Sequence, residues 1–187
     1  MNFLGTPVTW ITILICVLIF ITIQRQRESI LDTEIIRKYS LIPIQVKRGQ
    51  YYRLFTGGLI HLQIYHLLVN MYALYNLGSL MEVQLGSFWF IVILVLSIVC
   101  GNLACVYYGD SRTITVGISG GLYGLLAAYI IMLLRYGILT NPAVLSSVLR
   151  TVIINSIIMM MPNVSVLGHL GGAAAGAILA VIRFFIF

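Results

Sequence analysis

Long apolar runs alternate with short polar breaks along almost the whole chain. A helix needs about 20 mostly apolar residues to cross the hydrocarbon core of a bilayer, and six stretches approach that length. They are the ranges 6–24, 58–80, 87–108, 117–136, 148–162 and 166–187, of which the fifth is the shortest. The pattern predicts an all-α, polytopic membrane protein in which residues 1–187 form a single domain of six transmembrane helices.

The longest polar connection runs from about residue 25 to residue 57. It carries a helix-capping signal at Asp32 and Thr33 and stop signals at Pro43 and Gly49. Seven of the eleven basic residues lie within it, interspersed with apolar side chains. That mixture is typical of a segment on a membrane surface. We therefore expect short interfacial helices in contact with membrane lipid, and no nucleic-acid binding.

Composition supports a membrane location. Hydrophobic residues make up 60% of the chain and charged residues only 9%, whereas soluble domains have about 25% charged residues. No cleavage signal follows the first apolar run, which predicts a retained helix instead of a signal peptide. The three cysteines, Cys16, Cys100 and Cys105, lie in apolar stretches and give neither a disulfide framework nor zinc-ligand spacing.

Several of the few polar side chains in the spans are expected on one membrane face. Successive spans alternate in direction, so the second, fourth and sixth begin at the same face. His61 and His66 lie near the start of the second span, Ser119 near that of the fourth and His169 near that of the sixth. At about 1.5 Å rise per residue, each lies within about 12 Å of its helix start. All three histidines and this serine should therefore converge.

Ser119 and His169 form a possible nucleophile and general base, which would have to approach within about 3 Å. A lone membrane serine more often bonds its own backbone or a neighbouring helix, whereas an intramembrane histidine is functional by default. So close an approach needs small residues, and both helices supply them: Gly117, Gly120, Gly121, Gly124 and Ala128 in the fourth span, and Gly168, Gly172, Gly176 and Ala180 in the sixth. Such stripes alone would only pack helices; beside these two side chains they favour chemistry.

His66 and Asn70 are four residues apart and share one helical face. They suit hydrogen-bond donors for a developing oxyanion, together with the Ser119 amide at a helix N-terminus; an interhelical polar clamp is equally compatible. His61 lies about 140° round the helix from His66, so the two do not form a helical metal pair. The residues therefore give only a weak indication of a metal or haem site.

A Ser–His–Asp triad is disfavoured. Asp110 precedes the fourth span in a loop, and Glu82 ends the second at the opposite face. A hydrolase built on these residues would use a dyad whose histidine is oriented by packing. Tyr123, four residues after Ser119 and on its face, is the aromatic residue expected to stack on the imidazole.

These residues resemble the motifs of the rhomboid intramembrane serine proteases, over a region from about Tyr51 to Gly176. Three motifs occur in the expected order and spans: Gly-x-Ser-Gly at residues 117–120 followed by Tyr123, the second-helix pattern of His61, His66 and Asn70, and His-x-x-Gly at residues 169–172. The family's Trp-Arg pair in the first loop is replaced here by Tyr52 and Arg53.

The resemblance implies an endopeptidase that cleaves peptide bonds in or near the transmembrane segments of membrane proteins, without metal or cofactor. Ser119 would attack and His169 would take its proton, while His66, Asn70 and the Ser119 amide would stabilise the oxyanion. The supporting residues would be Tyr123, Gly117, Gly120, Gly172 and His61. The resemblance also implies a bacterial plasma membrane location, with an active site that opens to the non-cytoplasmic side.

The basic residues are distributed against that orientation. It would leave only Arg135, Arg150 and Arg183 on the cytoplasmic side and the other eight outside, contrary to the positive-inside tendency. A folded interfacial first loop would fall outside the scope of that rule.

Two other functions were weighed. A non-catalytic rhomboid-like protein that binds transmembrane helices is disfavoured because Ser119 and His169 are both present. A small transporter or channel is disfavoured because the chain has no repeats and no charge deep in its spans. The sequence does not predict the oligomeric state.

Overall fold

The computed structural model describes residues 5–25, 34–160 and 164–186. Its α-helices are α1 (Pro7–Arg25), α2 (Glu34–Tyr39), α3 (Pro43–Lys47), α4 (Arg53–Thr56), α5 (Ile64–Ala73), α6 (Ser79–Tyr108), α7 (Ser119–Arg135), α8 (Pro142–Met159) and α9 (Val166–Val181). Short 3-10 helices cover Gly57–Leu59 and Ile138–Thr140, and π-helical turns cover Leu74–Gly78 and Ile182–Ile186. Within these described ranges the only β-type pairing is an isolated bridge between Leu41 and Thr115, so the all-α prediction is confirmed.

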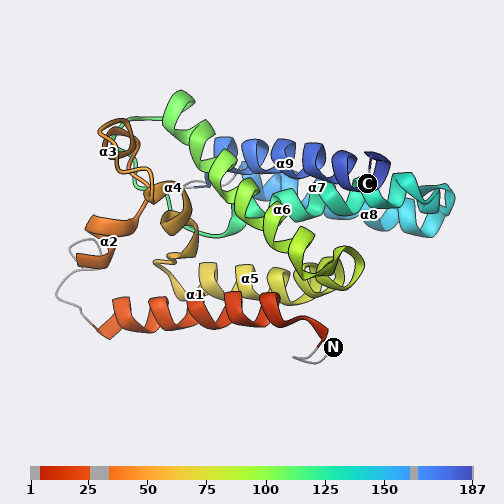
Figure 1. The fold of residues 1–187 in the computed structure, drawn as a ribbon, viewed down its shortest axis with the longest axis horizontal. Helices are drawn as coiled ribbons and strands as arrows, with labels where there is room; N and C mark the ends of the chain where they lie inside the picture. Colours follow the sequence, from red (N-terminus) through yellow and green to blue (C-terminus); the bar gives the residue numbers. More distant parts are fainter. Residues whose placement is uncertain (1–4, 26–33, 161–163, 187) are drawn as a thin grey trace.

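The long helices lie alongside one another, and α6 crosses between the α1–α5 pair and the α7–α9 pair (Figure 1). The short helices α2, α3 and α4 gather at one end of this bundle (Figure 1). The first turns of α5, α7 and α9 point toward that same end, as the alternation of spans predicts. Residues far apart in the sequence are thereby brought together beneath the first loop.

Several helices are long and apolar enough to cross a membrane. They are α1, the stretch Ile64–Tyr108, α8 and the helix Val166–Ile186, while α7 is a shorter apolar helix. Within Ile64–Tyr108, Gly86 has a φ of 76° and interrupts the helical backbone. A positive φ favours glycine because it has no Cβ. These features show an integral membrane protein.

The second predicted span begins later than expected. Residues 57–63 are not part of α5: a 3-10 turn is followed by extended backbone at Ile60 (φ −89°, ψ 139°) and at Gln63 (φ −124°, ψ 140°). The apolar run misled the prediction because this segment is held by tertiary contacts. The carbonyl of Gly57 accepts a hydrogen bond from the amide of Gly117. The helical angle assigned to His61 relative to His66 was therefore wrong.

The fifth predicted span was placed too late along the chain. Its helix, α8, begins at Pro142 and has 18 residues, one more than α7. The Asn141 side chain caps it by accepting from the amides of Ala143 and Val144, and proline suits the first helical position. Asn141 and Pro142 precede the predicted range 148–162 and in fact start the helix.

Glycines allow α6, α7 and α9 to pack backbone against backbone. A Cβ added at Gly172 would overlap the carbonyl group of Gly120, and one added at Gly176 would overlap Gly124. On the other side of α9, a Cβ at Gly101 of α6 would overlap the carbonyl group of Gly168. The two stripes of small residues therefore lie against each other, as small residues in membrane helices allow.

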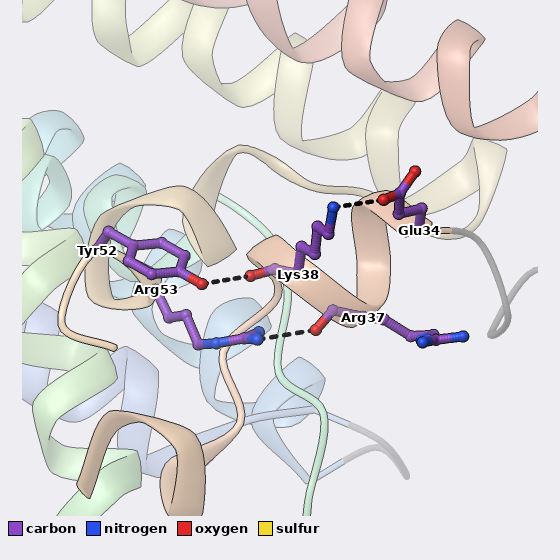
Figure 2. Close-up of polar contacts among 5 residues, drawn as sticks. All are labelled: Glu34, Arg37, Lys38, Tyr52 and Arg53. Carbon is purple, nitrogen blue, oxygen red and sulfur yellow. Dashed lines mark hydrogen bonds and ion pairs between the residues drawn. The ribbon is translucent and has the colours of Figure 1, made fainter. Parts of the chain in front are cut away.

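The first loop is folded around the buried guanidinium of Arg53. Its three nitrogen donors bond the Gln50 side chain at 2.7 Å, the Ser40 carbonyl at 2.7 Å and the Arg37 carbonyl at 2.8 Å. The Tyr52 hydroxyl donates to the carbonyl of Lys38, as Figure 2 shows. Arginine with every nitrogen bonded to oxygen can be buried at acceptable cost.

The two stop signals predicted in the first loop differ in the structure. Pro43 starts α3 instead of stopping a helix, whereas Gly49 follows α3 with a φ of 97°. The capping signal at Asp32 and Thr33 lies outside the described residues, as do residues 161 and 162 at the end of the fifth predicted span.

Candidate active site

Ser119 is the first residue of α7, directly after a tight turn. Gly117 has a φ of 113°, a backbone conformation that a side chain would strain. Because Ser119 opens the helix, its amide has no carbonyl partner within the helix. The turn therefore presents both the hydroxyl and the amide of Ser119 at the positive end of the helix dipole.

His169 lies in the first turn of α9 and is 6% exposed. Its Nε2 is 2.8 Å from the Oγ of Ser119, which is hydrogen-bond distance. The ring of Tyr123 stacks on the imidazole with centroids 4.1 Å apart and an angle of 16° between the planes. The structure thus brings the predicted pair into contact and places Tyr123 where the sequence predicted.

No carboxylate orients the imidazole within the described part of the chain, where His169 Nδ1 has no hydrogen-bond partner. Asp110 is exposed in its loop and accepts from the amide of Arg112. Glu82 accepts from the amides of Val8 and Thr9 at the start of α1. In the described residues the imidazole is therefore held by packing against Tyr123 and not by a carboxylate.

His66 and Asn70 both face the turn that precedes Ser119. A Cβ at Gly117 would lie 2.8 Å from His66 Nε2 and 3.7 Å from Asn70 Nδ2. Gly117 is thus required twice, by its positive φ and by the space these side chains occupy. Together they place hydrogen-bond donors around the start of α7.

His61 belongs to this polar cluster although it lies outside α5. Its Nε2 is 3.1 Å from Asn70 Nδ2, and its ring meets that of His66 edge-on with centroids 5.0 Å apart. His61 therefore contacts both Asn70 and His66 and helps to position their side chains. Across residues 5–25, 34–160 and 164–186, no three His, Cys, Asp or Glu side chains are grouped so as to hold a metal ion. The expectation of no cofactor stays a prediction.

Two further residues position the site and were missed from the sequence. Ser165 caps α9 by accepting from the Gly168 amide at 3.2 Å, and its Oγ lies 3.1 Å from Cys105 Sγ. Its place three residues before Gly168 is a capping pattern that was readable in the sequence. The carbonyl of Asn155 accepts from the Tyr123 hydroxyl at 3.2 Å. A main-chain acceptor leaves no sequence signal.

Comparison with known proteins shows the family to which the chain belongs. The profile of the Rhomboid domain matches residues 48–185. RHOMBOID-like protein 1 of Arabidopsis thaliana is 30% identical over 75% of this chain, RHOMBOID-like protein 7 of the same plant is 31% identical over 72%, and rhomboid protease GluP of Bacillus subtilis (strain 168) is 29% identical over 70%. The chain covers 36%, 43% and 26% of those relatives' own lengths, respectively.

The profile spans most of the chain and includes the loop around Arg53, the turn before Ser119 and the helix that carries His169. This protein belongs to the rhomboid family.

Proposed function

We propose that this protein is an intramembrane serine endopeptidase that cleaves peptide bonds in or near the transmembrane segments of membrane proteins. The observation that carries the proposal is the 2.8 Å approach of His169 Nε2 to Ser119 Oγ. The family acts on transmembrane substrates, and one relative is named a rhomboid protease. No other hydroxyl in the described residues contacts a histidine nitrogen.

The reaction begins when Ser119 Oγ attacks the carbonyl carbon of the scissile bond and His169 Nε2 takes its proton. The carbonyl oxygen becomes an oxyanion, which the Ser119 amide and the side chains of His66 and Asn70 stabilise by hydrogen bonds. His169 then protonates the leaving amine. Water attacks the acyl-enzyme with His169 again as the base, and the serine is regenerated.

Stacking by Tyr123 replaces the carboxylate that orients the base in a triad. It fixes the imidazole plane but supplies no negative charge, so the imidazolium formed during attack relies on its surroundings. Gly120 and Gly172 let α7 and α9 approach closely enough for the dyad to form. In this scheme His61 holds Asn70 through the 3.1 Å contact.

The proposal includes six transmembrane helices in one domain. The interruption at Gly86 divides Ile64–Tyr108 into two helices, which with α1, α7, α8 and the final helix make six. The orientation proposed is a bacterial plasma membrane protein with the dyad toward the non-cytoplasmic side. The buried, hydrogen-bonded Arg53 supports treating the first loop as a folded element and not as a flexible loop subject to charge counting.

A fluorophosphonate probe tests the activated serine. Detergent-purified protein is labelled and the adduct located by mass spectrometry, for the native chain, Ser119→Ala, His169→Ala and the control Ser156→Ala, which changes an exposed serine of α8. We expect an adduct on Ser119 in the native chain and the control only. An unlabelled native protein that unfolds cooperatively would instead support the alternative function, non-catalytic binding of transmembrane helices.

A further inference from the structure

Arg150 is the ninth of the 18 residues of α8, close to the middle of the helix. Its side chain is exposed, and Val148 is the one buried residue of that helix. A guanidinium at such a depth in a membrane is costly unless it meets a partner or reaches the interface. Such a residue in a spanning helix must meet an anionic partner or extend to the interface.

Among the residues that the structure describes, no carboxylate side chain pairs with Arg150. Glu34 pairs with Lys38, Glu82 accepts from the amides at the start of α1, and Asp110 accepts from the amide of Arg112. In the described residues, Lys38–Glu34 is the one ion pair. The described part of the chain therefore leaves the Arg150 guanidinium without a carboxylate, so an anion from outside the chain can bind it.

The surroundings of Arg150 combine a polar end with an apolar strip. A shallow concavity on α8 is lined by Pro142, Leu145, Ser146, Leu149, Arg150, Ile153 and Ile154. Ser146 lies one turn before Arg150 on the same face, with aliphatic side chains on both sides and beyond. Because Cα–Cβ bonds tilt toward the helix N-terminus, Arg150 extends toward Ser146 and Pro142. Its Cα lies about 12 Å from the start of the helix, within reach of the headgroup level.

The charge at this end of the bundle favours an anionic ligand. α8 begins at the end where α7 and α9 finish (Figure 1). Arg135 stands in the last turn of α7 and Arg183 in the turn that follows α9. No carboxylate lines the concavity, so the ammonium of a zwitterionic headgroup would find no acceptor there.

We propose that Arg150 binds the phosphate of an anionic phospholipid, with the Ser146 hydroxyl as a second donor and an acyl chain along Leu149, Ile153 and Ile154. The planar guanidinium can hold two phosphate oxygens at once. The aliphatic strip continues from the phosphate toward the membrane interior, as an acyl chain does. This site is separate from the dyad and does not depend on the proposed proteolysis.

Lipid binding is measured by native mass spectrometry of the detergent-solubilised protein, titrated with phosphatidylglycerol or with phosphatidylcholine. The variants are Arg150→Leu, Arg150→Lys and the control Arg112→Gln, which removes an exposed charge from a loop at the other end. Arg150→Leu replaces a charge that is costly within a span by an apolar side chain, and cooperative unfolding of the purified variant is measured to check that it folds. Since a charged hydrogen bond to phosphate is lost, we expect the first phosphatidylglycerol to bind about 10-fold more weakly to Arg150→Leu.

The control should bind phosphatidylglycerol like the native chain, and Arg150→Lys should bind it with intermediate strength. Unchanged affinity in Arg150→Leu would overturn the proposal, as would equal affinity of the native chain for both lipids. If inorganic phosphate displaced phosphatidylglycerol at an equal concentration, the lipid assignment would be overturned, because the acyl chains would then contribute little to binding.

Discussion

The helices that carry the dyad are packed very differently from their neighbour α8. On α9 the buried residues are Gly168, His169, Gly172, Gly176 and Ala180, a stripe that meets the glycines of α7. On α8 only Val148 is buried. Ser119 and His169 are thus positioned by backbone contact between their helices, whereas α8 beside them is mostly exposed.

One polar contact links the two regions at the site. The Tyr123 hydroxyl donates to the Asn155 carbonyl of α8, and the same tyrosine ring stacks on His169. Nearer the other end, α7 and α8 are separated by a groove lined by residues that include Leu126, Tyr129 and Thr151. Close packing positions Ser119 and His169, and the sparsely packed α8 lies beside them. Substitutions at five residues test that contrast.

Gly172→Val should have the largest effect. The added side chain overlaps the carbonyl of Gly120, so α9 must move away from α7 and His169 with it. A misplacement of about 1 Å can cost about 100-fold in rate, and we expect at least that loss in cleavage of a transmembrane substrate in proteoliposomes. Ala174→Val, on the exposed face of α9, is the control and should cleave normally. Full activity in Gly172→Val would show that close packing does not set the dyad.

His66→Ala and Asn70→Ala should each lower kcat by about 100-fold, because each removes one oxyanion donor. Neither changes the contact between α7 and α9, so the Ser119 adduct should still form, more slowly. Asn76→Ala, at an exposed asparagine, serves as the control. Unchanged kcat in both variants would show that His66 and Asn70 make only structural contacts. The catalytic groups would then all lie on α7 and α9.

The packed region was also the part most readable from the sequence. Glycines at four-residue spacing predict a close helix contact. Ser119 and His169 were predicted from their places near the starts of parallel spans, and Tyr123 from its spacing of four residues after Ser119. The predictions that were wrong concern segments whose placement depends on contacts that a periodic pattern does not show. His61 lies outside the helix because its segment is held by tertiary contacts, including the hydrogen bond from the Gly117 amide to the Gly57 carbonyl. The start of α8 was hidden because Asn141 and Pro142 resemble a break as much as a cap.

Glu82→Gln should affect stability more than turnover, and it extends the comparison to α1. That helix is anchored by the Glu82 carboxylate, which accepts from the amides of Val8 and Thr9 at 2.9 and 2.8 Å. Hydrogen bonds to a charged group contribute about 1.5–3 kcal/mol, so we expect a comparable loss in unfolding free energy in detergent. Glu34→Gln alters an exposed pair and should change little. A Glu82→Gln variant with native stability but no activity would place α1 among the elements that set the dyad.

Tyr123→Phe should have the smallest effect and decides whether α8 matters to the base. It keeps the ring on His169 and removes only the hydroxyl bonded to Asn155, a neutral hydrogen bond of about 1 kcal/mol. We expect kcat to fall by no more than about 5-fold. Tyr123→Ala also removes the stack and should fall further, since aromatic pairs contribute about 0.5–1.5 kcal/mol beyond burial. Tyr129→Phe, in the groove between α7 and α8, controls for the loss of a hydroxyl.

The two Tyr123 variants separate the ring from its hydroxyl. If Tyr123→Phe were as damaging as Tyr123→Ala, the ring alone would not orient the imidazole. The bond to Asn155 would then hold the tyrosine in place, and α8 would belong to the catalytic framework despite its single buried side chain. If Tyr123→Phe is nearly silent, the imidazole is oriented within α7 and α9 alone. In that case α8 is free to move against the site without disturbing the base, which is the arrangement that its sparse packing favours.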